Sequence, residues 1–348
     1  MVVGAPGDRM REPAVTSSDD RPRKSRWLPR GITWFILRRF LLGIATLFII
    51  SLIVFGATQA LPGDAARAIL GRDATPQKLA AVRKQLNLDR PVSEQYRDWL
   101  GGIVTGDLGR SLANQRPVSF FLGNRIVNSG FLVLLSAVIS IPLSLLLGSL
   151  GALWRDRPFD TVTSIINLAL AALPEFVIGV GLILLFATSV FQFLPAVSLI
   201  SPDTPVWEEL EFIVLPAITL ILAVTPYISR IMRGSMIEVL ESDYVEMARL
   251  KGLRERLVIS RHALPNGIIP AIQVTALQLA YLAGGVVVVE FVFTFPGIGQ
   301  ALVDAVSKRD LPIIQGLSML IAGVYVALNL LADVATILIS PRLRTSLR

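Results

Sequence analysis

Long apolar runs constrain this sequence more than any other feature. Residues 36–60 are nearly all apolar apart from Arg38 and Arg39, and as a helix they would be about 37 Å long, enough to cross the hydrocarbon core of a bilayer. Peptide groups inside lipid must be hydrogen-bonded within the chain, so each such run is expected to be helical. The other predicted spans are residues 126–153, 162–186, 212–228, 268–292 and 314–339. The sequence therefore predicts an all-α polytopic membrane protein with six transmembrane helices.

The composition agrees with this fold class and excludes several functions. The chain is 53% hydrophobic and 17% charged. Its net charge of +7 does not indicate nucleic-acid binding, because basic residues flanking apolar spans are what membrane orientation requires, and no aromatic residues interleave with a basic stripe. The absence of cysteine excludes disulfides and thiolate metal sites, and a single histidine, His262, excludes most histidine-based catalysis.

The distribution of charge predicts the orientation of the spans. Basic residues gather before the first span and in segments 155–157 and 230–261, whereas the short 194–211 segment has acidic residues and no basic one. Positive residues in short loops are retained on the cytosolic side. We therefore expect a multi-pass protein of the bacterial inner membrane with both termini in the cytosol.

The chain divides into five predicted parts. Its first residues lack a periodic apolar face and are rich in Pro, Arg, Asp and Ser, which is typical of a disordered extension. After the first span, helices are predicted to begin at Thr75-Pro76 and at Ser93, followed by a turn at residues 106–109. The division is 1–30 disordered cytosolic extension, 31–60 first transmembrane helix, 61–124 extracytoplasmic helical cap, 125–341 core domain with five transmembrane helices, and 342–348 cytosolic tail.

One charged stretch, residues 242–265, lies between two apolar spans and begins with the signals of a short helix. Asp243 is expected to cap this helix, with Glu246 reaching back to the cap. Gly252 is expected to take the left-handed conformation that ends it.

A second short helix is predicted from Arg254 to about residue 264, where Pro265 and Pro270 stop it. The expected object is two short helices that meet at a glycine corner on the cytosolic face. The basic residues of this corner are Arg249, Lys251, Arg254, Arg256 and Arg261. Such a rigid, charged corner is suited to being held by another molecule.

The spacing of residues in this stretch resembles a known pattern. Glu246-Met247-Ala248, Gly252 and Leu264-Pro265 resemble the EAA loop of permease subunits of ATP-binding-cassette (ABC) importers. Further motifs follow in compatible order: Leu37-Arg38-Arg39, Leu61-Pro62-Gly63-Asp64, Leu88-Asp89-Arg90-Pro91, Gly106-Asp107-Leu108-Gly109, Ala248-Arg249-Leu250-Lys251-Gly252-Leu253, Arg261-His262-Ala263-Leu264, Pro296-Gly297-Ile298-Gly299 and Pro341-Arg342-Leu343-Arg344. With these, residues 34–348 resemble the dipeptide/oligopeptide/nickel permease family, specifically its B-type subunit.

The resemblance implies the type I ABC importer permease fold. In that fold residues 242–265, called the EAA segment below, form cytosolic coupling helices that dock on an ATPase and pass its motion to the spans. The residues that the resemblance assigns to this coupling are Glu246, Ala248, Arg249, Gly252, Arg254, Leu264 and Pro265.

The resemblance also implies partners and a cargo. The partners are a second, homologous permease subunit of the C type, two cytosolic ABC ATPase subunits, an extracytoplasmic substrate-binding protein and membrane lipid. The sequence has no Gly-Lys dipeptide and hence no Walker A loop, so ATP and Mg are expected on the ATPase chains, and this chain is expected to be neither an enzyme nor a cofactor carrier. The cargo is expected to be peptides or a similar small solute.

Polar groups within the predicted spans are candidates for the translocation pathway, because ionisable side chains are costly in hydrocarbon unless they face water or a partner. The candidates are Pro174, Glu175, Gln278 and Glu290. Pro174 is expected to bend the third span. Glu175 either lines the cavity or makes a helix-packing contact, and Glu290 either belongs to an outer gate or sits in the membrane interface. Asp333 is expected to pair with Arg342, with Arg344 or with a neighbouring helix.

Two other functions fit parts of the pattern. A self-sufficient secondary transporter or channel, driven by an ion gradient, would use Glu175 and Glu290 as relay groups. A membrane scaffold or receptor would bind ATPases without moving solute. The ABC permease is preferred because the EAA pattern and the accompanying motifs agree with one another.

Overall fold

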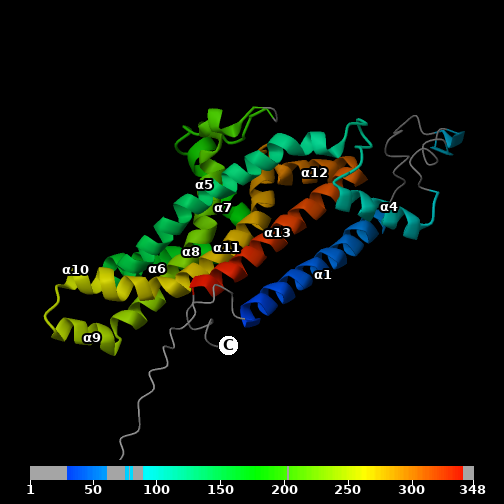
Figure 1. Ribbon diagram of the computed structural model, residues 1–348. Helices are drawn as coiled ribbons and strands as arrows, with labels where there is room; N and C mark the ends of the chain where they lie inside the picture. The colour runs from blue at the N-terminus through cyan, green and yellow to red at the C-terminus, as the bar shows by residue number, and fades with distance from the viewer. Residues whose placement is uncertain (1–29, 61–74, 78, 81–88, 202–203, 340–348) are drawn as a thin grey trace, which may run out of the picture.

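The computed structural model describes residues 30–60, 75–77, 79–80, 89–201 and 204–339, and these residues are almost entirely helical (Figure 1). Within them the one β contact is an isolated bridge between Arg110 and Pro117. Two predicted segments lie outside the described residues, namely the N-terminal extension and the C-terminal tail. Most of the helix predicted from Thr75-Pro76 lies outside them too.

The helices follow the predicted order. Their bounds are α1 Arg30–Ala60, α4 Val92–Thr105, α5 Val118–Leu153, α6 Pro158–Ala172, α7 Glu175–Ile183, α8 Val214–Leu240, α9 Asp243–Leu250, α10 Glu255–Leu257, α11 Leu264–Val292, α12 Ile298–Lys308 and α13 Leu311–Ile339. Two π-helical segments, η2 Leu184–Thr188 and η5 Val258–Ala263, extend α7 and precede α11, and two short 3-10 turns, η3 Val206–Glu208 and η4 Leu210–Phe212, lead into α8.

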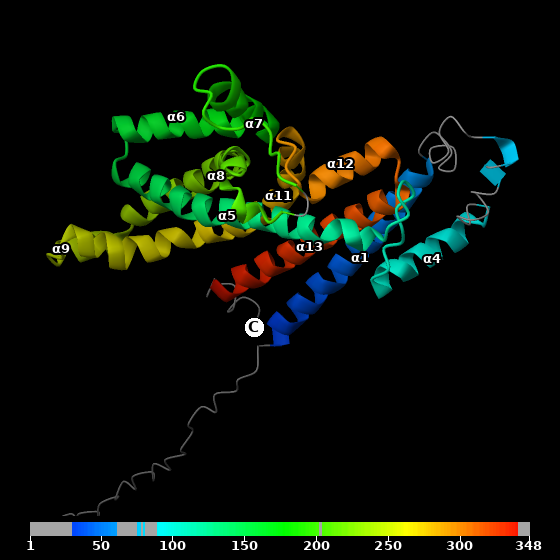
Figure 2. The ribbon, with the colours of Figure 1, turned by 90° about the horizontal axis from the view of Figure 1, so that it is seen from above.

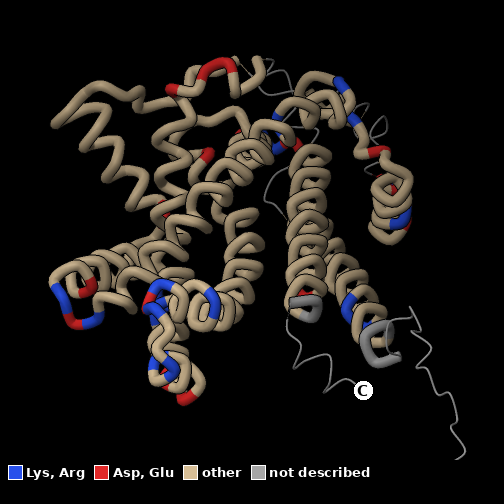
Figure 3. Tube along the Cα trace, turned by 60° about the vertical axis from the view of Figure 1, so that its left-hand side comes forward, with Lys and Arg blue, Asp and Glu red and all other residues tan. Residues whose placement is uncertain are grey.

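The described residues contain five helices long and apolar enough to cross a membrane, and a sixth span if the bent pair of α6 and α7 counts as one. Charged residues are concentrated near the helix ends, while the middles of the helices are mostly uncharged (Figure 3). The predicted all-α, six-span fold is therefore confirmed, with one span broken.

The core forms where α8 packs between α5 and α11. Leu132 of α5, Leu220 of α8 and Leu282 of α11 are all fully enclosed there. Helix α13 packs on α11, and α1 runs alongside α13 (Figures 1 and 2). Nε of Arg39 on α1 lies 3.2 Å from a carboxylate oxygen of Asp333 on α13, so Asp333 pairs with a neighbouring helix, one of the partners predicted for it.

The third span was predicted to be a single bent helix, but the structure shows two separate helices. Leu173 and Pro174 are extended, and α6 and α7 meet at an angle of 108°. Proline disfavours the helical conformation of the residue before it, and it has no N–H to continue the hydrogen-bond ladder. The chain therefore breaks the span into two helices instead of kinking one.

The fourth span is longer than predicted. Arg230 and Arg233 were expected to end it near residue 228, yet α8 continues to Leu240. The reason is visible at Arg233, whose guanidinium donates two hydrogen bonds to the carboxylate of Asp160 at 2.6 and 2.7 Å. A neutralised arginine is tolerated inside a packed helix, so its charge does not mark the helix end.

The part of the extracytoplasmic cap that is described packs on α1. The rings of Tyr96 and Trp99 on α4 lie 5.3 and 5.5 Å from the ring of Phe55 on α1. The predicted turn follows α4, with Gly106 and Gly109 both at positive φ.

Asp310, just before α13, holds the next loop in place. Its buried carboxylate accepts hydrogen bonds from the Ser111 hydroxyl and from the backbone N–H groups of Leu112 (3.1 Å) and Ala113 (3.3 Å). These bonds join the loop after α4 to the start of α13, at the end of the molecule opposite α9 (Figure 2).

We predict that Asp310→Ala lowers the free energy of unfolding by about 2–3 kcal/mol, because it leaves buried donors without their charged acceptor. Thermal unfolding of the purified protein in detergent measures this loss. The control is Asp98→Ala, which removes an exposed ion pair with Arg90 and should cost less than about 1 kcal/mol. Equal melting temperatures for the two variants would contradict the assigned role of Asp310.

Candidate functional site

The glycine corner of the EAA segment forms as predicted. Gly252 has a φ of +76°, its N–H donates to the carbonyl of Arg249 at 2.9 Å, and the N–H of Leu253 donates to the carbonyl of Ala248 at 3.4 Å. This pair of bonds is the Schellman arrangement, in which a left-handed residue satisfies the last carbonyls of a helix. The direction of the chain after α9 is therefore fixed by backbone hydrogen bonds.

The start of α9 differs from the prediction. Ser242, not Asp243, is the N-cap residue, and it makes no side-chain capping bond. Its hydroxyl instead donates back to the carbonyl of Val239 in α8. Because that hydroxyl is already engaged with α8, the predicted capping box is not formed, and Asp243 and Glu246 remain exposed acidic residues in the first turn of α9.

An ion pair closes the corner. Nη2 and Nε of Arg249 lie 2.8 and 3.2 Å from the two carboxylate oxygens of Glu255, on the far side of Gly252. Hydrogen bonding to Glu255 raises the pKa of Arg249 above its ordinary value. Arg249 was predicted for ATPase contact, but the structure engages it within the segment, where it ties α9 to α10.

Helix α9 has one buried and one exposed face. Val245 and Ala248 pack with Val258 in a small apolar cluster beneath the corner. This close packing explains why a small residue stands at position 248.

The opposite face of α9 carries three large apolar side chains in the open. Tyr244, Met247 and Leu250 are 45%, 52% and 73% exposed. At a spacing of three residues they share one side of the helix. Figures 1 and 2 place α9 at one end of the molecule.

The prolines after the corner do not stop the second helix, contrary to the prediction. The chain is helical without a break from α10 through the π-helical η5 into α11, with Pro265 in the first turn of α11 and Pro270 in its interior. The wide turn of a π segment gives room for a proline ring, and the first turn of a helix needs no donor from it. Leu264 and Pro265 thus lie in one helical rod with the corner.

The pathway candidates near the broken span come together. Pro174 is the exposed N-cap residue of α7, and the carboxylate of Glu175 accepts a hydrogen bond from the Tyr281 hydroxyl of α11 at 2.9 Å. A side chain at Gly285 would lie within 3.5 Å of the same carboxylate. The break in the third span therefore places Glu175 against α11.

Gln278 lies on the same helix, one turn before Tyr281. Its buried Oε1 has no hydrogen-bond partner among the described residues. A buried acceptor without a partner is costly, so it marks a position where water or another polar group is expected.

Glu290 lies elsewhere, and its burial contradicts the expected place in the membrane interface. Its side chain is 0% exposed and accepts hydrogen bonds from the Ser129 hydroxyl and from the N–H of Gly299 at 2.6 Å. A Cβ atom at Gly297 would overlap its carboxylate. Glu290 therefore holds the turn after α11 to α5 and does not lie in the membrane interface.

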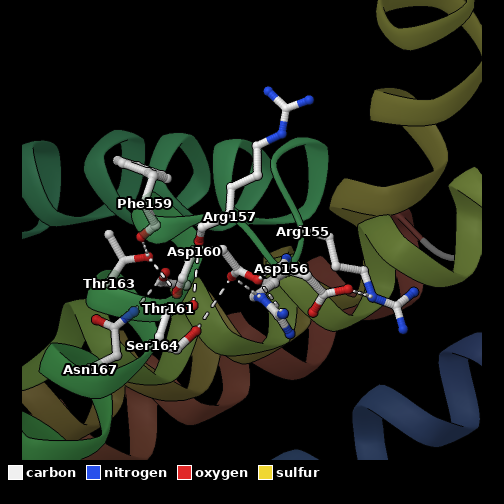
Figure 4. Close-up of polar contacts among 11 residues, drawn as sticks. Arg155, Asp156, Arg157, Phe159, Asp160, Thr161, Thr163, Ser164 and Asn167 are labelled. Atoms are coloured by element: carbon white, nitrogen blue, oxygen red, sulfur yellow. Dashed lines mark hydrogen bonds and ion pairs between the residues drawn. The ribbon is translucent and has the colours of Figure 1, made fainter.

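Sequence reasoning missed Asp160. Its carboxylate is only 3% exposed, faces Arg233, and also accepts a hydrogen bond from the N–H of Asp156 at 3.0 Å (Figure 4). The available signal was that a carboxylate stands near the start of an apolar run, because an unpaired charge costs free energy in the membrane. Its partner lies 73 residues away, so the pairing required the fold.

Comparison with known proteins agrees with this arrangement. A family model described as "Binding-protein-dependent transport system inner membrane component" matches residues 119–345. A second, for the N-terminal part of such membrane components, matches residues 32–138. Relatives named "Glutathione transport system permease protein GsiC", from Escherichia coli strain K12 and Shigella flexneri serotype 5b, are 36% identical over 310 residues, which cover 89% of this chain and 98% of each relative.

We predict that Gly252→Val strains the corner by roughly 1–2 kcal/mol, because a β-branched residue is poorly tolerated at positive φ, whereas Gly252→Asn is milder. No atom lies within 4 Å of the Cβ position, so the effect comes from the backbone alone. Hydrogen exchange of the α9 amides measures it as lost protection. Gly101→Val, at a helical glycine with equally open surroundings, is the control and should not alter exchange in α9.

Proposed function

The chain belongs to the family of binding-protein-dependent transport system inner membrane components, and from this premise we propose that its EAA segment receives the motion of cytosolic ATPase subunits. The family makes the chain a multi-pass inner membrane protein and the permease subunit of an ABC importer, a transport subunit and not an enzyme. Such a subunit works with a partner ATPase, a binding protein and a second permease.

The exposed apolar face of α9 carries this proposal. Large apolar side chains gathered on an exposed helix are expected to be covered by a partner. Tyr244, Met247 and Leu250 are the surface we assign to the groove of an ATPase. Glu246 and Arg254, both exposed, flank it as polar contacts, while Ala248 and Gly252 shape the segment from within.

The rod from α10 to α11 transmits the motion. Because helix follows the corner without a break, a displacement of α9 acts directly on α11. The Tyr281 side chain of α11 contacts Glu175 at the start of α7, in the broken third span. We therefore propose that this chain contributes three residues to the translocation pathway, namely Pro174, Glu175 and Gln278. Glu290 contributes indirectly, because it holds the turn after α11.

We assign a full complex of this subunit, a C-type permease, two ATPases that bind ATP and Mg, and an extracytoplasmic binding protein. The EAA segment then lies in the cytosol, and both termini with it. The cargo we propose is a peptide or similar small solute, because the relatives from Escherichia coli and Shigella flexneri are glutathione permeases by name and glutathione is itself a tripeptide.

We predict that Leu250→Asp reduces copurification of the ATPase subunits, and uptake by the reconstituted complex, by tenfold or more. A buried charge at an interface is costly when unpaired, whereas a surface substitution changes folding by about 0.5 kcal/mol or less. Val104→Asp, at an 80% exposed position on α4, is the matched control and should leave both measurements unchanged. Normal association of the Leu250 variant would contradict docking through this face.

The energy source is tested in the same vesicles. Uptake should require ATP on the ATPase side and persist when the proton gradient is collapsed. Uptake that continues without ATP and stops with the gradient would establish a self-sufficient secondary transporter instead.

A further inference from the structure

A polar cavity lies near the cytosolic ends of α5, α6 and α8. Its volume is about 270 Å³. The residues that line it are Leu147 from α5, Thr163, Ser164, Asn167 and Leu168 from α6, and Ser229, Arg230 and Arg233 from α8. Six of these eight side chains are polar or charged, which is unusual for a cavity between membrane-spanning helices.

One of its two arginines is uncompensated. Arg233 is neutralised by Asp160, which it contacts through two hydrogen bonds. Arg230 lines the same cavity and has no hydrogen-bond or ion-pair partner among the described residues. The cavity therefore holds one net positive charge, and its surplus of donors favours an anionic guest.

Separate polar contacts lie between the cavity and the broken span. The side-chain amide of Asn167 donates to the Ser229 hydroxyl at 3.2 Å. One turn of α6 further on, the Tyr227 hydroxyl donates to the carbonyl of Ala171 at 3.4 Å. Beyond the break in the span, Glu175 faces Tyr281. Polar groups are thus spaced along the α6–α7 side of the molecule, from Glu175 at one end to Arg230 at the other.

The depth of Arg230 identifies the place along the pathway. Along the axis of α8, Arg230 lies about 24 Å from Val214, the first residue of that helix. The hydrocarbon core of a bilayer is roughly 30 Å thick. Arg230 therefore stands near the cytosolic boundary of the membrane, where a solute leaves the pathway.

We propose that this cavity is a binding site for the free carboxylate of the transported solute, held by Arg230 on the cytosolic side. The inference rests on the proposed transport function. A guanidinium matches a carboxylate in geometry as well as charge. The Ser229 hydroxyl, which lines the cavity and accepts a hydrogen bond from Asn167, keeps its own proton to donate to the guest, whereas the hydroxyls of Thr163 and Ser164 already donate to Phe159 and Asp160.

A lipid phosphate is the other source of an anion at this depth. The cargo is favoured because the exposed apolar residues Val162, Ile165 and Ile166 of α6 do not line the cavity. A lipid headgroup site also has no need of the polar groups that continue from Asn167 toward Glu175.

The test uses the complete complex in liposomes with two probes, trialanine and its C-terminal amide. Arg230→Gln should reduce uptake of the free acid about tenfold to a hundredfold, the loss expected for a charged hydrogen bond, and reduce uptake of the amide much less. Arg230→Lys should restore most of the free-acid uptake. Arg157→Gln is the control, because that side chain points away from the Asp160 cluster (Figure 4), and it should change neither rate.

Each other result has a distinct meaning. Equal losses for both probes, or no loss, would overturn the carboxylate site while leaving the transport proposal intact. Wild-type vesicles that take up neither probe would overturn the peptide cargo and this inference with it. If both probes depend on added phosphatidylglycerol in phosphatidylcholine vesicles, and Arg230→Gln abolishes that dependence, the cavity binds lipid and the inference is wrong. Copurification of the ATPases with each variant verifies assembly.

Discussion

An unpaired peptide group in hydrocarbon is costly, and that cost determines where this chain is regular and where it is not. Pro142, Pro226 and Pro270 all lie inside continuous helices. Among the membrane segments that the structure describes, the backbone becomes extended only at Leu173 and Pro174, and both residues are exposed on the surface of the chain. Irregular backbone at membrane depth is tolerated where protein covers it or where it lines a water-filled cavity. The broken span therefore indicates the side on which a second subunit or an aqueous path must lie.

The EAA segment is joined to the membrane helices on both sides without a flexible linker. Its second helix continues through η5 into α11, and its first helix follows α8 after Glu241 and Ser242. The inner ends of α8 and α11 pack closely, since a side chain at Gly267 would lie within 3.0 Å of Met236. The EAA segment therefore bridges two membrane helices that already touch. A force on α9 is therefore transmitted to both membrane helices. A flexible loop in the same place would absorb that force.

Periodic and local features were readable from the sequence. Apolar length predicted α11 and α13 to within about four residues, and the conformational freedom of glycine predicted the left-handed turn at Gly252. Local signals also misled, because Pro265 was interpreted as a helix stop without knowledge of the π turn before it. Prolines report only that a donor is missing, and the surrounding backbone decides whether the helix continues.

Features that depend on pairing between distant residues were not readable. Arg233 looked like a helix end because Asp160 is 73 residues away. The burial of Glu290 was not foreseen because its donors Ser129 and Gly299 come from another helix and from beyond a turn. An isolated charge in a span predicts that a partner exists. It does not say which one, and the partner decides between a structural and a transport role.

These pairings also bear on the source of energy. A proton-driven transporter needs titratable groups within reach of one another along the pathway. Glu290 is enclosed by its own turn, and Asp160 is engaged by Arg233. Between Glu175 and the α9 end of the chain, the described polar side chains along α6 and α8 include Tyr227, Asn167 and Ser229, together with the hydroxyls and arginines that line the cavity. Among these described residues they do not make a chain of carboxylates. We therefore propose that the pathway is opened by work done elsewhere, which can enter at the exposed face of α9.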